Sequence, residues 1–307
     1  MTEPIAVLQG HTDSVKALVI LPNGHIVSGS FDNSLRIWDP YTHKCISVLQ
    51  GHTGPVRALA IFPNGHIVSG SADRSIRIWD PTIEECIAVL QEHTNGVWAL
   101  AILPNGHIVS GSDHSLRIWD PTIEECIAVL QGHTNLVWAL AILPNGYIVS
   151  GSSDCSIRIW DPVTGECIAV LHGHTNVVWA LAIHPNGHIV SGSIDRSIRI
   201  WDPTINECNA VLQGQGQGLT NVVQALAILP NGYIVSGSYD HSLRIWDPTA
   251  EECIAVLQGH TDWVRALTIL PNGYIVSGSN DYSIRIWDGS PYIEYDDDDD
   301  DCKAAIN

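Results

Sequence analysis

Short apolar runs separated by turn residues follow one another along most of the chain. In one representative stretch the runs occupy residues 56–61, 67–71, 76–80 and 86–90. They are rich in Val and Ile and too short for helices, so they predict β-strands. Pro63-Asn64-Gly65 supplies a fixed φ followed by residues that tolerate positive φ, which predicts a tight turn between the first two strands. Runs such as residues 99–102 are apolar at every position, which is typical of strands buried on both faces.

The same set of runs recurs, and the dipeptide Trp-Asp marks each copy. It occurs seven times, at separations of 40 to 45 residues, at Trp38, Trp79, Trp119, Trp160, Trp201, Trp246 and Trp287. A four-stranded unit with two apolar faces has to be sandwiched between copies of itself, and a radial arrangement leaves only short, protected strand edges. The repeat therefore predicts an all-β protein, a seven-bladed β-propeller of four-stranded antiparallel blades.

The Gly-His and Trp-Asp pairs at this spacing resemble the WD-repeat (WD40) family over about residues 5–288. The resemblance implies a ring that serves as a docking platform for proteins, usually without catalysis. It places the propeller at residues 1–288 and leaves 289–307 as an acidic tail that we expect to be disordered. The sequence motifs Ala-Leu-Ala-Ile-Leu-Pro-x-Gly and Val-Ser-Gly-Ser are similar to those in the propeller of phospholipase A2-activating protein, a ubiquitin-binding relative.

The two ends of the repeat array indicate how the ring closes. The last unit stops at Asp288 without a fourth apolar run. Residues Ile5–Gly10, which precede the first unit, have the sequence that the fourth run has in the other units. The resemblance implies that this N-terminal strand completes the seventh blade. The alternative is that Tyr292–Tyr295 supplies the strand instead.

Each unit also repeats polar residues that invite a catalytic interpretation. The Ser, His and Asp of a unit are the residue types of a nucleophilic triad, but catalysis needs that set once, in one cleft. The family resemblance implies instead a buried hydrogen-bond network of His, turn Asp, strand Ser and Trp, because buried polar groups must satisfy one another. The six histidines are His11, His52, His93, His133, His174 and His260, and the seven aspartates are Asp32, Asp73, Asp113, Asp154, Asp195, Asp240 and Asp281.

Two units depart from this pattern. Unit six replaces Gly-His with the longer stretch 214–219, so Asp240 lacks its usual histidine, and we expect this blade to be locally looser. Unit three lacks the residue before Asp113, which shortens the turn and leaves the position of this carboxylate open.

Composition and charge narrow the class of protein and of partner. The 307 residues are 45% hydrophobic, which excludes a disordered chain. The 14 Lys and Arg against 33 Asp and Glu give a net charge of −19, which argues against duplex nucleic acid as the partner. No apolar run is long enough for a membrane span, and six of eight cysteines occupy one repeat position too far apart for disulfides. We expect a monomeric ring in the cytoplasm, with the nucleus as the alternative. No Cys-x-x-Cys pair, Walker loop or dinucleotide loop occurs, so we expect neither a metal nor a cofactor.

In a near-identical array, recognition has to lie where the copies differ. Most differences fall at three positions per unit, just before the Val of the first strand, just after it and just before the turn Asp, and in WD-repeat propellers these positions line the top face around the channel. One of them follows the first-strand Val. It reads Lys16, Arg57, Trp98, Trp138, Trp179, Gln224 and Arg265 around the ring. Because unit seven adjoins unit one, the cations form one sector and the indoles another. Trp263, Phe31 and Tyr239 occupy neighbouring variable positions.

The two sectors predict an elongated protein or peptide partner, with an acidic or phosphorylated end on Arg57, Arg265 and Lys16 and an apolar anchor on the indoles. The alternative for the indoles is ordinary packing over neighbouring blades. Other functions left open are a methyl-lysine reader, a substrate receptor of the ubiquitin system, a single-stranded RNA platform and a propeller hydrolase. The third connections are rich in Glu, which predicts an acidic underside, and the aspartates 296–301 are candidate competitors for the arginines.

Overall fold

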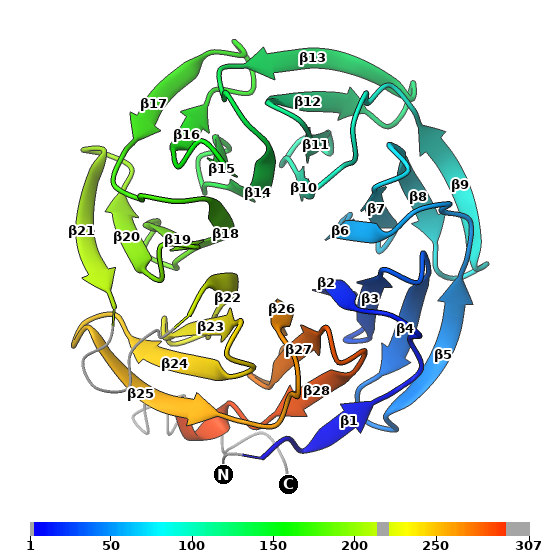
Figure 1. Cartoon of the computed structure of the whole chain (residues 1–307). Coiled ribbons are helices and arrows are strands. Elements are labelled where there is room, and N and C mark those ends of the chain that lie inside the picture. The colour runs from blue at the N-terminus through cyan, green and yellow to red at the C-terminus, as the bar shows by residue number, and fades with distance from the viewer. Residues whose placement is uncertain (1–2, 214–220, 293–307) are drawn as a thin grey trace, which may run out of the picture.

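The chain forms a ring of seven four-stranded antiparallel sheets around a central opening (Figure 1). The computed structural model describes residues 3–213 and 221–292. The prediction of an all-β seven-bladed propeller is confirmed. Within each blade the strands run in sequence order from the opening to the circumference, except in the blade that contains both ends of the described chain.

The strands of the first four complete blades are β2 Val15–Ile20, β3 Ile26–Ser30, β4 Leu35–Asp39 and β5 Lys44–Leu49; β6 Val56–Ile61, β7 Ile67–Ser71, β8 Ile76–Asp80 and β9 Glu85–Leu90; β10 Ala99–Ile102, β11 Ile108–Gly111, β12 Ser115–Asp120 and β13 Glu125–Gln131; β14 Val137–Ile142, β15 Ile148–Ser152, β16 Ile157–Trp160 and β17 Cys167–Leu171. The remaining strands are β18 Val178–Ile183, β19 Ile189–Ser193, β20 Ile198–Asp202 and β21 Glu207–Leu212; β22 Val223–Ile228, β23 Ile234–Ser238, β24 Leu243–Asp247 and β25 Glu252–Leu257; and β26 Val264–Ile269, β27 Ile275–Ser279, β28 Ile284–Trp287 and β1 Ala6–Leu8, which share the last blade. A short 3-10 helix, Ser290–Tyr292, follows β28.

Burial is greatest in the second strand of each blade and least in the outermost strand. The second strand is buried at every residue, as in β7, whereas the outermost strand is exposed at alternate residues, as in β9. The expectation of two buried faces therefore applies to the inner strands, and the outermost strand has one wet face. Antiparallel order puts the start of each innermost strand and the turn after each second strand on one face of the ring, here the top face. The Pro-Asn-Gly turns and the third connections lie on the other face, the underside.

The Pro-Asn-Gly turn forms because each of its residues suits the local backbone. Gly65 has φ of 90°, a conformation that glycine adopts without steric cost, and its N–H donates to the carbonyl of Phe62 at 2.8 Å. Asn64 Oδ1 accepts the N–H of His66 at 3.0 Å. The turn is thus closed by its own hydrogen bonds, which fixes the register of β6 against β7.

A glycine in each second strand lets neighbouring blades approach closely. A Cβ on Gly151 would lie 2.7 Å from Cγ1 of Val178 in the next blade, and one on Gly278 would lie 2.6 Å from Cγ1 of Val15. The first Val of each unit is fully buried in this contact. The Gly of Val-Ser-Gly-Ser is therefore required by packing between blades, because no side chain fits there.

We expect Gly151→Ala to lower the free energy of unfolding by about 1–3 kcal/mol, since the added methyl overpacks the contact with Val178. In a double-mutant cycle measured by urea denaturation, Gly151→Ala combined with Val178→Ala should cost less than the sum of the two single changes. Strictly additive costs would show that the methyl is accommodated elsewhere.

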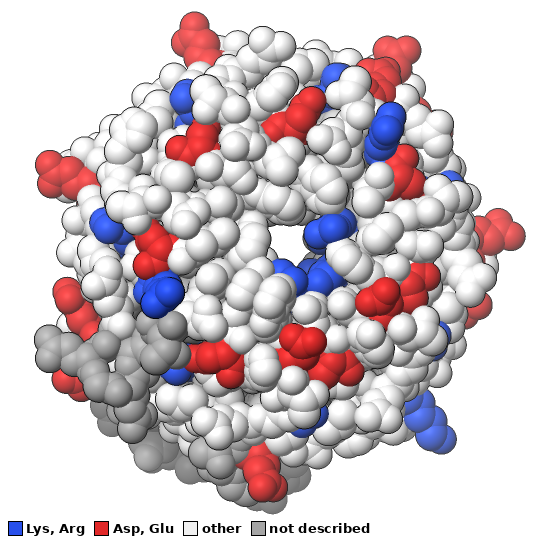
Figure 2. Space-filling view, in the orientation of Figure 1, with Lys and Arg blue, Asp and Glu red and all other residues white. Residues whose placement is uncertain are grey.

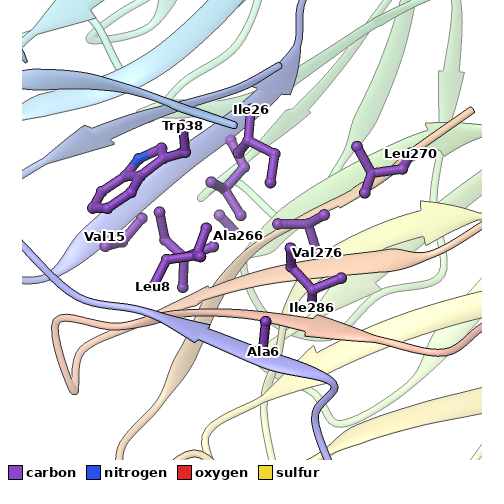
Figure 3. Close-up of a cluster of buried hydrophobic side chains, with 11 residues drawn as sticks. Ala6, Leu8, Val15, Ile26, Trp38, Ala266, Leu270, Val276 and Ile286 are labelled. Atoms are coloured by element: carbon purple, nitrogen blue, oxygen red, sulfur yellow. The ribbon is translucent and has the colours of Figure 1, made fainter. Parts of the chain in front are cut away.

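The N-terminal strand closes the ring, as the sequence predicts. β1 pairs with β28, with Ala6 opposite Ile286 and Leu8 opposite Ile284. Leu8 joins Val15, Trp38 and residues of the last blade in one buried cluster, which seals the junction between the two ends of the array (Figure 3). Tyr292, the first residue of the alternative strand Tyr292–Tyr295, does not pair with β28. It belongs to the 3-10 helix, and its carbonyl accepts from Asn231 Nδ2 on the underside. Residues 293–295 lie outside the described chain.

Candidate functional site

The repeated Ser, His, Asp and Trp form one hydrogen-bonded chain inside a blade. In the fourth blade of the array, His133 donates or accepts at 2.6 Å with Ser150 Oγ and lies 2.8 Å from Asp154 Oδ2. Trp160 Nε1 donates to the same Ser150 Oγ at 2.8 Å. If the serine hydroxyl donates to His133 Nε2, Nδ1–H donates to the carboxylate and every group is satisfied. The blades of His11, His52, His174 and His260 repeat the same contacts.

This arrangement is structural rather than nucleophilic. Ser150 has no exposed surface and His133 is 5% exposed, so no substrate reaches the hydroxyl. Burial alone would raise the pKa of Asp154, but hydrogen bonds from His133 and Ser156 lower it well below its usual range. The carboxylate is therefore a permanent acceptor that fixes the ring of the histidine.

The third blade of the array breaks the network, and the expected role of Asp113 is wrong. In the part of the chain that the structure describes, His93 keeps its 2.7 Å contact with Ser110 but makes no hydrogen bond to Asp113. Asp113 accepts instead from Thr94 Oγ1 at 3.3 Å. The turn is one residue shorter than in the other units, so the carboxylate does not reach Nδ1. Burial, with the nearby Arg117, lowers the pKa of His93 to about 4, and Asp113 raises it too little to compensate.

We expect His93 to make the stability of this blade depend on pH. A histidine whose pKa is lower in the folded than in the unfolded protein stabilises the fold above pH 6.5, and this contribution is lost as the pH falls toward 4. The difference in free energy of unfolding between the native chain and His93→Gln should therefore shrink by up to about 1.4 kcal/mol per pH unit over that range. Urea denaturation between pH 7 and pH 4.5 measures it. A difference that does not change with pH would contradict the broken contact with Asp113.

The sixth unit fills the place of its missing histidine with an arginine. Arg244 Nη1 donates to Asp240 Oδ2 at 2.7 Å and to Ser242 Oγ at 2.9 Å, and Arg244 is 7% exposed. In other blades the equivalent arginine donates Nη1 to a cysteine Sγ instead, as Arg199 does to Cys208. The stretch 214–219 lies outside the described residues, and the looser packing expected of this blade stays a prediction.

The seven variable residues after the first Val meet at the mouth of the central opening. They line one cavity of about 110 Å³: Lys16, Arg57, Trp98, Trp138, Trp179, Gln224 and Arg265. Lys and Arg side chains gather on one side of the opening, over β2, β6 and β26, and uncharged side chains form the rest of the rim (Figure 2). The contiguous cationic and aromatic sectors of the sequence thus face one another across a single hollow.

Polar neighbours hold two of the three cations of this cavity, here called the basic trio. Asn280 Oδ1 accepts from Lys16 Nζ at 2.7 Å and from Arg265 Nε at 3.0 Å. Arg265 Nη1 also donates to Gln224 at 2.8 Å. Arg57 is held by ring faces instead, with its guanidinium 4.3 Å from the Phe31 centroid and 4.9 Å from the Trp98 centroid.

Partial burial lowers the pKa values of the trio. Burial, with Arg265 and Arg57 nearby, lowers the pKa of Lys16 to about 7. Burial, followed by the charge of Arg265, lowers the pKa of Arg57 to about 10. Burial also lowers the pKa of Arg265. The mouth therefore concentrates positive charge that its own surroundings do not neutralise.

The aromatic residues form a continuous arc around the other side of the mouth. Ring centroids are 5.3 Å apart for Trp98 and Trp138, 6.2 Å for Trp138 and Trp179, and 5.6 Å for Trp179 and Tyr239. Tyr239 then stacks on Trp263 at 3.7 Å with an interplanar angle of 6°. All four indoles are partly exposed. They pack on one another along the top face, so they lie outside the core clusters but are also not separate, free-standing rings.

Sequence reasoning missed two polar supports of this site. Asn280 joins Lys16 to Arg265, and Ser153 Oγ accepts from Trp138 Nε1 at 2.6 Å. Both residues occupy the variable position before the turn Asp, the position that drew attention to Phe31 and Tyr239. The variation of this position between units is a signal that applies to the polar residues as well as to the aromatic ones.

The underside carries a different set of side chains. The glutamates of the third connections are exposed there, at Glu84, Glu85, Glu124, Glu125, Glu166, Glu207, Glu251 and Glu252. The last described residue, Tyr292, also lies on the underside, beside Asn231. The competition of aspartates 296–301 for the arginines concerns residues outside the described chain and stays a prediction.

Comparison with known proteins identifies the repeat. A family model described as "WD domain, G-beta repeat" matches residues 2–39, 43–80, 84–120, 124–161, 165–202, 206–247 and 251–288. No curated protein matches the chain as a relative. Within residues 3–213 and 221–292, no helix is long and apolar enough to cross a membrane, and no group of three or more His, Cys, Asp or Glu is placed to hold a metal ion.

Proposed function

The chain belongs to the WD40 repeat family, and from this premise we propose that it is a non-catalytic scaffold that binds a protein segment on its top face. Proteins of this family are generally protein-interaction scaffolds. The observation that carries the proposal is the convergence of all seven variable positions on one cavity. Blades that are otherwise near copies differ most where their side chains meet, which is how a binding site is built on a repeated frame.

The partner we propose has an anionic element and an apolar one. An acidic or phosphorylated group would lie on the basic trio, where Arg side chains favour bidentate contact with a carboxylate or phosphate. An apolar or aromatic side chain would lie across the arc from Trp98 to Trp263, because Trp, Tyr and Arg are the residues that contribute most to binding energy in interfaces. The cavity holds only the anionic group, so the rest of the segment would extend over the top face.

The arc is poorly suited to the competing function of a methyl-lysine reader. A quaternary ammonium needs open ring faces around it, whereas the rings here already cover one another at centroid distances of 3.7 to 6.2 Å. Guanidinium groups lie over the faces of Trp98 and Trp263, at 4.9 and 4.6 Å, and would repel a second cation. The same cations would suit a receptor of the ubiquitin system that reads a phosphorylated motif.

Burial of the repeated serines supports the absence of catalysis in this proposal, because a hydrolase needs a nucleophile that substrate can reach. The seven described cysteines are free thiols, which supports a reducing compartment, the cytoplasm or the nucleus. The monomeric ring stays a prediction that sedimentation of the full chain tests.

The proposal predicts that the top face alone determines partner binding. We expect Trp98→Ala with Trp138→Ala and Trp179→Ala, or separately Arg57→Gln with Arg265→Gln, to lose proteins that the native chain captures from a lysate. Each recovered protein should then bind these variants about thirtyfold more weakly by calorimetry, the effect of removing a binding hot spot.

A matched control removes three exposed apolar side chains from outer strands, Ile87→Ala, Ile127→Ala and Ile168→Ala. It should retain the captured proteins. Far-ultraviolet circular dichroism and the thermal midpoint show that each variant is folded. Proteins kept equally by all variants, or lost only from the outer-strand control, would refute a top-face site.

A further inference from the structure

The basic trio has no carboxylate partner in the described part of the chain. The Lys and Arg ion pairs with carboxylates there involve Arg117, Arg244 and Arg285, none of which lies at the mouth. Asp13 and Asp262 are near enough to raise the pKa of Lys16, but burial and the two arginines outweigh them. A chain with net charge −19 therefore keeps three clustered cations away from ion pairs at one place.

Hydrogen-bond donors at this place are also left over. Among the described residues Arg57 donates no hydrogen bond, unlike outer arginines such as Arg77, whose Nη1 donates to Cys86 Sγ at 3.8 Å. Trp98 Nε1, beside it, is buried without an acceptor. Arg265, by contrast, is anchored by Gln224 and Asn280. The cavity thus holds one cation fixed by hydrogen bonds, Arg265, and one whose donors are unused, Arg57, an arrangement that favours an acceptor-rich anion.

The size of the cavity limits that anion. The cavity is small, with a volume of about 110 Å³, and a compact tetrahedral oxyanion suits it. A phosphate monoester carries about −1.5 to −2 charges and three acceptor oxygens, whereas a carboxylate carries one charge and two oxygens. A carboxylate would leave part of the trio uncompensated.

We propose that the mouth cavity is a phosphoryl-binding site in which Lys16, Arg57 and Arg265 surround the phosphate of a phosphorylated ligand. This inference deepens the proposed function and rests on it only for the kind of molecule that carries the phosphate. The arginines receive the oxygens in bidentate contacts, and Lys16 supplies a compact third charge.

Binding of a dianion at this place takes up a proton. The groups that face Lys16 are Arg57 and Arg265, which lower its pKa to about 7 together with burial, and Asp13 and Asp262, which raise it. Lys16 therefore titrates much closer to neutral pH than an exposed lysine does. A phosphate beside it favours the ammonium form, so the pKa rises and a proton is bound.

Calorimetry with the full chain and small phosphomonoesters tests the inference. Phenyl phosphate should bind at least tenfold more tightly than benzoate at pH 7, and Arg57→Gln or Arg265→Gln should each weaken it tenfold or more. Arg158→Gln, on the outer part of a blade, is the matched control and should bind like the native chain. Repeating the titration in buffers of different ionisation heat should show proton uptake that is missing in Lys16→Met.

Two further arms identify the source of the phosphate. Tighter binding of a degenerate phosphoserine peptide mixture than of inorganic phosphate assigns the site to phosphorylated proteins, and the reverse order assigns it to a free phosphate ligand. Equal binding of phenyl phosphate and benzoate, or binding that the arginine variants do not weaken, overturns the inference. If phosphate fails while partner capture still depends on the indoles, the proposed function stands alone; if phosphate binds while capture ignores the top face, only the phosphoryl site stands.

Discussion

Deleting residues 1–9 is expected to lower the free energy of unfolding by about 3–6 kcal/mol and to open the ring. The deletion removes β1, so Leu8 and Ala6 no longer cover the last blade, and burial of those two side chains alone contributes about 3 kcal/mol. The outward edge of β28 also loses its hydrogen-bonded neighbour and becomes an exposed template for other chains. Urea denaturation and size-exclusion chromatography measure both effects.

Two comparisons make the deletion informative. Removing residues 1–3 alone should leave stability unchanged, because the hydrogen bonds to β28 begin at Ile5, whose N–H donates to the carbonyl of Ile286 at 2.7 Å. Grafting residues 4–9 behind Asp288 through a copy of residues 81–85, which lead from β8 into β9, should restore most of the loss. If the grafted chain is as unstable as the deletion, the N-terminal residues stabilise the ring by some route other than pairing with β28.

The second large effect is expected from Asp154→Ala, a loss of about 3–5 kcal/mol. The carboxylate accepts from His133 Nδ1 at 2.8 Å, from the Thr134 N–H at 3.0 Å and from Ser156 Oγ at 2.6 Å. Its removal leaves a buried imidazole and a serine hydroxyl without their acceptor, which costs the full desolvation of both groups.

The chain contains its own control for this substitution. Asp113→Ala removes the equivalent residue of the blade in which the contact with His93 is absent, so it should cost about 1 kcal/mol or less. Both variants are compared by urea denaturation at pH 7, far above the lowered pKa values of Asp154 and Asp113. Equal losses at the two positions would mean that the histidine contact contributes little and that the turn itself accounts for the stability.

Most of the architecture could be predicted because the sequence states it seven times. The repeated sequences of the strands and turns predict the blades. The single apolar run before Gly10 predicts how the ring closes, and the structure confirms both. A single copy would have left the strand order open, because short apolar runs do not specify their neighbours. The repeat supplied the missing constraint that each blade must fit against a copy of itself.

The departures from the repeat were harder to predict in detail. The missing histidine of unit six was visible, but the sequence did not show that Arg244 turns inward to reach Asp240, because an arginine occupies that position in every blade. The choice of rotamer depends on which neighbour is absent. The same limit applies at the mouth, where the two sectors were predicted from residue type, and the mutual stacking of the rings was not.

The contact between each second-strand glycine and the first Val of the next blade is the same around the whole ring, whereas the residue that follows that Val differs from blade to blade. Blades are therefore interchangeable at their seams while their lining residues are individual. Exchanging two units within the gene would preserve this contact between blades and move a charge or an indole to another position around the ring. On the proposed function, the order of the blades would set where each charge and each indole meets the partner, so an exchange of blades would change specificity without a new side chain.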